Sequence, residues 1–293
     1  MNVYSQIDSN KFKTWLIMAL FISFIATLAY IYGKASGYGL SFAGIALIIS
    51  GIISFISYYY SDKMILGMSG AKKIEKIDNP KLFRVVENLS IGAGLPMPKV
   101  YVIQDLAPNA FATGRDPKHA VVCATTGLID KLTETELEGV IAHELSHIGN
   151  YDIRVMSIVV VLVGVVALLA DFFLRSMWYG GRDRNAAGIF VLIGVIFAIL
   201  SPIIATLIQL AVSRKRELLA DASAVLLTRY PEGLAMALEK IGRDKEVLKS
   251  ANNATAHLYI ANPFKGKALH HWFTGLFNTH PPIEERIKIL RSM

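Results

Sequence analysis

The sequence predicts a mainly helical α+β domain with a small β-sheet, attached to four transmembrane helices. Two observations lead to this prediction. Of the 293 residues, 53% are hydrophobic and only 18% are charged, which is too apolar for an ordinary soluble enzyme. The excess lies in four apolar runs, each about long enough to cross a hydrocarbon core of roughly 30 Å. These runs are residues 15–32, 39–60, 155–174 and 186–212.

The apolar runs divide the chain into alternating membrane and hydrophilic parts. Residues 1–60 form a predicted N-terminal transmembrane hairpin, and residues 153–212 form a second one. The hydrophilic stretches 61–152 and 213–293 are together long enough for one compact domain with its own core. Because two crossings separate these stretches, both lie on the same side of the membrane, and we expect them to form two parts of one domain.

Basic residues beside the apolar runs predict that this domain faces the cytoplasm. Lys11 and Lys13 precede the first run, and further clusters at 72–76 and 214–216 follow the second and the fourth. Arginines between the third and fourth runs oppose this orientation. Either these two runs form a shallow or re-entrant hairpin, or the other basic clusters outweigh the arginines. The net charge of +7 therefore favours contact with anionic lipid headgroups, and no nucleic-acid motif is present. A single cysteine, Cys123, excludes an internal disulfide and is expected to pack in the core.

An HExxH pattern carries the strongest chemical information in the chain. It consists of His143, Glu144 and His147, and it follows a capping box that Thr133 and Glu136 predict. Apolar residues repeat with a period of 3.6 through this stretch, so the pattern lies on a helix. Two histidines four residues apart on one helix face can bind a zinc ion, with the intervening glutamate beside the open side of the metal as general base. A buried pair of packing histidines is the alternative.

A catalytic zinc site requires a third protein ligand. Glu217 and Asp221 follow the fourth apolar run and share one helix face at positions i and i+4. Glu217 would bind the zinc ion, and Asp221 would hydrogen-bond the outer nitrogen of a ligand histidine. From the spacing alone, a solvated helix surface is an equally good interpretation, because this spacing is common on helices.

In combination, these motifs resemble the HtpX family of integral-membrane zinc metalloproteases, which are related to the CAAX prenyl proteases. The resemblance covers essentially the whole chain and implies a zincin-type metalloprotease domain in the cell (inner) membrane. It implies one zinc ion per chain, bound by His143, His147 and Glu217, and the family name alone suggests a stress response. The matching motifs are residues 108–114, 143–147, 217–221 and 279–286, in this order.

The resemblance also implies roles for two further segments. Residues 109–114 form a predicted strand that resembles an edge strand lining the cleft, where an exposed edge would bind an extended peptide. His280 and Arg286 resemble the residues that face the reacting carbonyl and stabilise its developing charge. Without the resemblance, a loop junction, a turn histidine and a surface arginine are the simpler interpretations. The predicted substrate-binding residues are Asn109, Ala110, Phe111 and Ala112.

The sequence therefore predicts a membrane-bound zinc endopeptidase with Glu144, His280 and Arg286 as catalytic residues. Both ligand segments lie close to apolar runs, so we expect the metal near the membrane surface, with polypeptide substrates such as damaged or misfolded membrane proteins. A processing peptidase of narrow specificity is an open alternative. A membrane zinc-binding or transport protein is more remote, because the apolar runs offer only Asp171, Gln209 and a few hydroxyls. The oligomeric state leaves no mark on the sequence.

Overall fold

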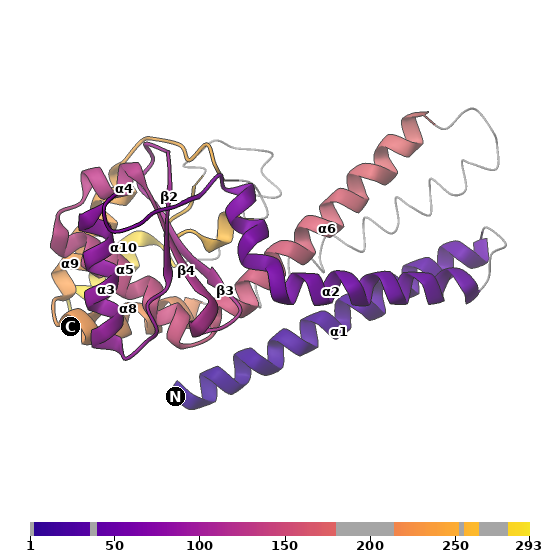
Figure 1. The fold of residues 1–293 in the computed structure, drawn as a ribbon, viewed down its shortest axis with the longest axis horizontal. Coiled ribbons are helices and arrows are strands. Elements are labelled where there is room, and N and C mark those ends of the chain that lie inside the picture. Colours follow the sequence, from indigo (N-terminus) through magenta and orange to yellow (C-terminus); the bar gives the residue numbers. More distant parts are fainter. Residues whose placement is uncertain (1–2, 36–39, 180–213, 252–254, 264–280) are drawn as a thin grey trace.

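The computed structural model of the chain describes residues 3–35, 40–179, 214–251, 255–263 and 281–293. Long helices extend to one side of a mainly helical domain that contains a small sheet (Figure 1). Helices α1 (Val3–Ala35) and α2 (Leu40–Met68) pack together as a hairpin, and α6 (Asp152–Tyr179) packs against both. This arrangement confirms a mainly helical α+β fold with membrane helices attached.

Two of the described helices can cross a membrane by length and composition. The candidate spans are Ile7–Ile31 within α1 and Ala43–Met68 within α2. A third exists if the pair Glu134–Gly149 and Asp152–Val166, which is bent by 84°, counts as one broken span. The predicted run 186–212 lies outside the described residues. Helix α2 continues beyond the end of its predicted run because Ile65 and Leu66 pack in the domain core.

The sheet is mixed, with strand order β1-β2-β4-β3. Strands β2 and β4 are parallel, while the pairs β1–β2 and β3–β4 are antiparallel. Strand β3 is therefore an edge strand. It ends at Gly114, whose φ of +135° and close contact with the His119 carbonyl, 2.4 Å from a Cβ built there, require a glycine. The strands are β1 (Lys72–Lys73), β2 (Lys99–Ile103), β3 (Ala110–Gly114) and β4 (Ala120–Thr125).

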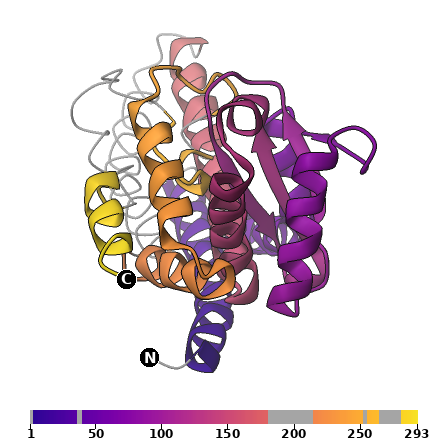
Figure 2. The same ribbon diagram turned by 90° about the vertical axis from the view of Figure 1, so that its left-hand side faces the viewer.

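Helix α5 (Glu134–Gly149) lies in the middle of the domain, between α3 (Pro80–Ala93) and the pair α8 (Arg214–Thr228) and α9 (Pro231–Arg243), as Figure 2 shows. The predicted capping box is present: Thr133 and Glu136 each bind the backbone N–H of the other. Gly139 allows α9 to approach closely, because a Cβ at this position would lie 2.7 Å from the Leu234 nitrogen. The remaining helices are α4 (Thr126–Lys131), α10 (Ile283–Leu290), and the short 3-10 helices η1 (Pro117–His119) and η2 (Ala256–Leu258).

A sharp break separates α5 from α6. Helix α5 ends at Gly149, and Asn150 is its C-terminal cap. Tyr151 then adopts a left-handed conformation with φ of 60°, and α6 begins at Asp152 in a direction 84° away. The break returns the first residue of α6 to the end of α5 that carries His147.

Candidate active site

Three side chains from two helices converge at the centre of the domain. His143 and His147 come from α5 and Glu217 from α8, and their exposed fractions are 1%, 4% and 1%. The two histidine Nε2 atoms lie 3.2 Å apart, and the Glu217 carboxylate oxygens lie 3.5 Å from the first and 3.4 Å from the second. A tetrahedral zinc ion with bonds of roughly 2.0–2.1 Å separates its ligand atoms by about 3.3 Å. The predicted ligands therefore have the spacing of a zinc site.

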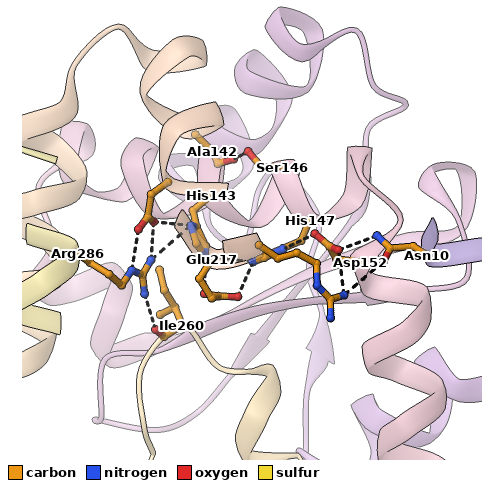
Figure 3. A network of polar contacts seen from close by, with 11 residues as sticks. Asn10, Ala142, His143, Ser146, His147, Asp152, Glu217, Ile260 and Arg286 are labelled. Carbon is orange, nitrogen blue, oxygen red and sulfur yellow. Dashed lines mark hydrogen bonds and ion pairs between the residues drawn. The ribbon is translucent and has the colours of Figure 1, made fainter. Parts of the chain in front are cut away.

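Hydrogen bonds on the far side of each ring direct both histidines towards a metal (Figure 3). His143 Nδ1 lies 2.9 Å from Asp221, and His147 Nδ1 lies 3.1 Å from Asp152. An ionised carboxylate only accepts hydrogen bonds, so in the neutral form of each ring Nδ1 carries the proton and Nε2 has the lone pair. Two such lone pairs and a carboxylate, directed at one point, favour a cation there.

The buried charges around this point also fit a divalent cation. Four carboxylates surround it, and their exposed fractions are 3% or less. Two buried guanidinium groups, those of Arg216 and Arg286, offset half of this charge. The two remaining negative charges equal the charge of one divalent cation, and buried charges without a counter-charge are costly. The carboxylates are those of Glu144, Asp152, Glu217 and Asp221.

The same electrostatics shift the pKa values of the buried groups. Burial lowers the pKa of His143, but hydrogen bonds with Asp221 and Glu217 outweigh it and raise the pKa to about 9. His147 follows the same pattern, because Glu217 and Asp152 raise its pKa against the effect of burial. Burial raises the pKa of Asp221, but the Arg286 guanidinium and His143 together outweigh it and lower the pKa to about 2. Carboxylates that attract a proton to these rings attract a metal cation for the same reason.

Arg286 lies behind His143, where it pairs with Asp221. Its Nε and one terminal nitrogen donate to the two Asp221 oxygens at 2.8 and 2.6 Å, and the other donates to the Ile260 carbonyl at 3.1 Å. The side chain is 0% exposed. The interpretation as a surface charge is therefore wrong, and the guanidinium is engaged by the Asp221 carboxylate and the Ile260 carbonyl. His280, its predicted partner, lies outside the described residues.

Three residues that the sequence did not point to support His147. Asp152 binds its Nδ1, Arg216 donates to the same Asp152 at 3.3 Å, and Asn10 donates to it at 2.8 Å. Arg216 was predicted to contact lipid headgroups with its neighbours, and this is wrong because the side chain is only 6% exposed and pairs with Asp152. The preceding Arg214 is exposed. A sequence feature that could have revealed Asp152 is the helix stop just before it.

Glu144 and Cys123 lie close to this centre. Glu144 is 2% exposed on α5, between the two ligand histidines in sequence, and its charge contributes to raising the pKa of Arg286. Cys123 is a buried free cysteine in β4, which confirms the predicted packing role. Burial and, to a lesser extent, the charge of Glu144 raise the pKa of its thiol, so the group stays protonated and unreactive.

Strand β3 lies at the edge of the sheet, but this edge is buried and not exposed as predicted. At one end, the Ile260 N–H donates to the Ala110 carbonyl at 3.0 Å. At the other end, the Gly114 N–H donates to the Ser157 hydroxyl at 3.2 Å. Backbone groups alternate between the two sides of a strand, so those of Ala112 point towards the same outer edge.

The chain around Ile260 covers the predicted substrate-binding residues. Asn109 donates from its side chain to the Ala261 carbonyl at 3.1 Å. The ring of Phe111 packs edge-on against Tyr259, with centroids 5.2 Å apart. A peptide that pairs with β3 near Ala110 has to displace this segment, because the Ala110 carbonyl already accepts from the Ile260 N–H on the outer edge of the strand.

Comparisons with known proteins agree with this site. Residues 76–293 match the model of peptidase family M48. The chain is 48% identical over 296 residues to the "Protease HtpX homolog" of Dictyoglomus turgidum, covering 99% of this chain and 94% of that protein. It is 47% identical over 293 residues to the protein of the same name from Tropheryma whipplei (strain Twist), covering 99% of this chain and 98% of the relative.

Among solved structures, the chain resembles the crystal structure of S. mikatae Ste24p. The TM-score is 0.52 at 18% sequence identity, and the match covers 95% of this chain and 66% of that one. At this identity the likeness concerns the fold alone. The family match and the full-length relatives show more than the fold: this chain belongs to peptidase family M48 and is a membrane-bound metalloprotease.

Proposed function

We propose that the chain is a zinc-dependent endopeptidase in which His143, His147 and Glu217 bind one zinc ion. The observation that carries this proposal is the convergence of three buried ligand atoms, 3.2 to 3.5 Å apart. Nitrogen and oxygen ligands in a nearly tetrahedral arrangement suit zinc, and two imidazoles make magnesium or calcium a poor fit.

Glu144 is the general base of this proposal. When bound, zinc acidifies a water molecule and polarises the substrate carbonyl. Glu144 takes the proton of the attacking water and passes it to the leaving amine. Asp221 and Asp152 keep the proton of each ligand histidine on Nδ1, and Arg286 holds Asp221 ionised. His280 remains the candidate for stabilising the oxyanion, whereas the position of Arg286 favours a role in positioning Asp221.

Extended polypeptides are the proposed substrates, bound along β3. The backbone groups of Ala112 point outward in the middle of the strand. At its two ends, Ala110 bonds to Ile260 and Gly114 bonds to Ser157. Pairing through the backbone tolerates many side chains, which suits an enzyme that acts on varied unfolded segments. To bind such a substrate along β3, the segment around Ile260 has to move. This requirement limits cleavage of folded proteins.

Membrane proteins are the proposed source of these segments. The supporting observation is that Asn10, within the candidate span Ile7–Ile31, lies 2.8 Å from Asp152, which in turn binds the ligand His147. The metal centre is therefore within a few side chains of a membrane helix. We propose quality control of damaged or misfolded membrane proteins, in a multi-pass protein of the inner membrane whose catalytic domain faces the cytoplasm.

The test compares detergent-purified wild type with Glu144→Gln. We expect both to bind one zinc ion per chain, and only the wild type to cleave an unfolded protein until a chelator is added. Zinc binding without cleavage in both would refute the assignment of a general proteolytic activity. For the substrate class, one segment is presented either beside a membrane span or in soluble form. Equal cleavage rates of the two forms would contradict the membrane preference.

A further inference from the structure

Helix α1 carries a polar end on an otherwise apolar packing face. Ile17 and Phe21 are buried against α6 side chains such as Val159. Thr14 and Asn10 continue the same face towards the N-terminus, and both are 0% exposed. Asn10 lies inside the candidate span Ile7–Ile31. Burying an amide so completely is costly unless its hydrogen bonds are satisfied, so the contacts of Asn10 show what it stabilises.

The contacts of Asn10 lead directly to the metal centre (Figure 3). Its Nδ2 donates at 2.8 Å to Asp152 Oδ1 and at 2.8 Å to the Asn150 carbonyl. Its Oδ1 accepts from Arg216 at 3.4 Å. The second Asp152 oxygen lies 3.1 Å from Nδ1 of His147. A chain of hydrogen-bonded groups therefore joins a membrane helix to a metal ligand.

The position of these contacts explains why the connection matters. Asn150 is the C-terminal cap of α5, and Asp152 is the first residue of α6. Between them, Tyr151 has the left-handed conformation that makes the 84° break. One amide group of Asn10 binds both sides of this break. It therefore fixes the angle between the helices and, with it, the place where the Asp152 carboxylate meets His147.

We propose that Asn10 is a positioning residue of the metal centre, so that docking of membrane helix α1 sets the zinc affinity. The inference rests on the proposed zinc site. The Asp152 carboxylate holds His147 in the tautomer that binds metal, and such partners typically change metal affinity by about 10–100-fold. Asn10 acts one step further out, by holding Asp152. The amide side chain suits this position because it donates to two acceptors and accepts from Arg216.

The experiment measures zinc affinity of the full-length chain in detergent by competition with a chelator. Asn10→Leu keeps the number and branching of the heavy side-chain atoms and removes the donors, and we expect its zinc Kd to rise by about 10-fold. On an unfolded protein substrate, kcat falls with little change in KM, because no contact with substrate is lost. Thr14→Ala is the matched control. It removes a buried hydroxyl one turn away that donates to the Asn10 carbonyl at 2.9 Å, and its zinc Kd stays within about twofold of wild type.

A double-mutant cycle tests the route through Asp152. In the Asp152→Ala background, Asn10→Leu changes the zinc Kd by less than about twofold, because the residue through which it acts is already lost. Additive losses would overturn the proposed route. Asn10→Ala, which adds no atoms, replaces Asn10→Leu if the larger side chain prevents folding.

The outcomes separate this inference from the proposed function. A wild-type chain that binds no zinc refutes the proposed function. A wild type that binds zinc, together with Asn10 variants that bind it equally tightly, refutes only the role of Asn10. Equal losses in Thr14→Ala and Asn10→Leu would also overturn that role, because any disturbance of α1 packing would then suffice.

Discussion

Removing the guanidinium of Arg286 is expected to destabilise the domain by leaving a buried carboxylate without its partner. Arg286 donates to both oxygens of Asp221 at 2.8 and 2.6 Å, and both side chains are 0% exposed. Breaking a buried ion pair by removing one partner costs about 3–5 kcal/mol. A domain of this size loses about 2–4 °C of melting temperature per kcal/mol, so Arg286→Met should melt about 6–20 °C lower.

Thermal unfolding of the detergent-purified chain measures this effect, and Arg291→Met is the matched control. Arg291 follows the same C-terminal helix and pairs with Glu232 and Glu239, but it is exposed. Exposed ion pairs contribute about 0–1 kcal/mol, so this variant should melt close to the wild type. Arg286→Lys, which keeps the charge and loses the two-pronged contact, should fall between them.

The pH dependence of the Arg286 effect has a definite sign. In the wild type, Arg286 lowers the pKa of Asp221 to about 2, so the stability it contributes is present above the unfolded pKa of about 3.9 and is lost as the pH falls through about 2. Without the arginine, only His143 opposes the effect of burial, so the pKa of Asp221 rises. Protonation then relieves the buried charge in Arg286→Met, and the difference in melting temperature should narrow as the pH falls towards about 4.

One result would refute this reasoning. If Arg286→Met melts within about 2 °C of Arg291→Met at neutral pH and yet loses proteolysis, the arginine does not stabilise Asp221. Its function would then be the predicted contact with the developing oxyanion. Loss of stability together with loss of zinc would support the position that the structure gives it.

Three further predictions concern the metal and the packing around it. Glu217→Gln should lower zinc affinity by more than about 100-fold, because loss of a hydrogen-bond partner behind a ligand already costs up to about 100-fold. The zinc content after dialysis measures this loss of affinity. Because the pKa of His143 is raised to about 9 and that of His147 is raised too, protons compete with zinc for these rings. Zinc affinity should therefore fall at least about tenfold per pH unit as the pH is lowered, and a chelator-competition Kd that stays constant between pH 6 and 8 would contradict this. Gly139→Ala forces a methyl group to within 2.7 Å of the Leu234 nitrogen, so unfolding should become about 1–3 kcal/mol easier with zinc content unchanged. A melting temperature equal to that of wild type would show that α9 can move away.

The pairing of His143 with His147 could be predicted from the sequence because helix geometry fixes it locally. Two histidines four residues apart lie on one face of any helix, and the capping box at Thr133 defined where that helix begins. Glu217 and Asp221 share one face of α8 at the same spacing, but a solvated surface explains that spacing equally well, and only the resemblance of the motifs assigned their roles. The resemblance of the motifs predicted the small sheet and the edge position of residues 110–114. It did not predict that this edge is covered, because the covering contact comes from Ile260, 150 residues further along the chain.

Asp152 was missed because spacing on a continuous helix argues against it. Five residues after His147, a straight helix would turn the side chain by about 140° away from the histidine. The left-handed Tyr151 and the 84° bend reverse this expectation and return the carboxylate to within 3.1 Å of the ring. Asn10 and Arg216 could not be found by spacing at all, since their contacts with Asp152 join residues 142 and 64 positions apart.

Each ligand histidine has the same sequence of partners behind it, but the two sets come from different parts of the molecule. His143 is backed by Asp221 from α8, which Arg286 of α10 neutralises. His147 is backed by Asp152 from α6, which Arg216 of α8 neutralises. The partners of His143 all come from the domain itself, whereas Asp152 behind His147 accepts a further hydrogen bond from Asn10 of membrane helix α1. Weakening the membrane attachment should therefore disturb the coordination at His147 before that at His143, which makes one metal ligand responsive to the state of the membrane helices.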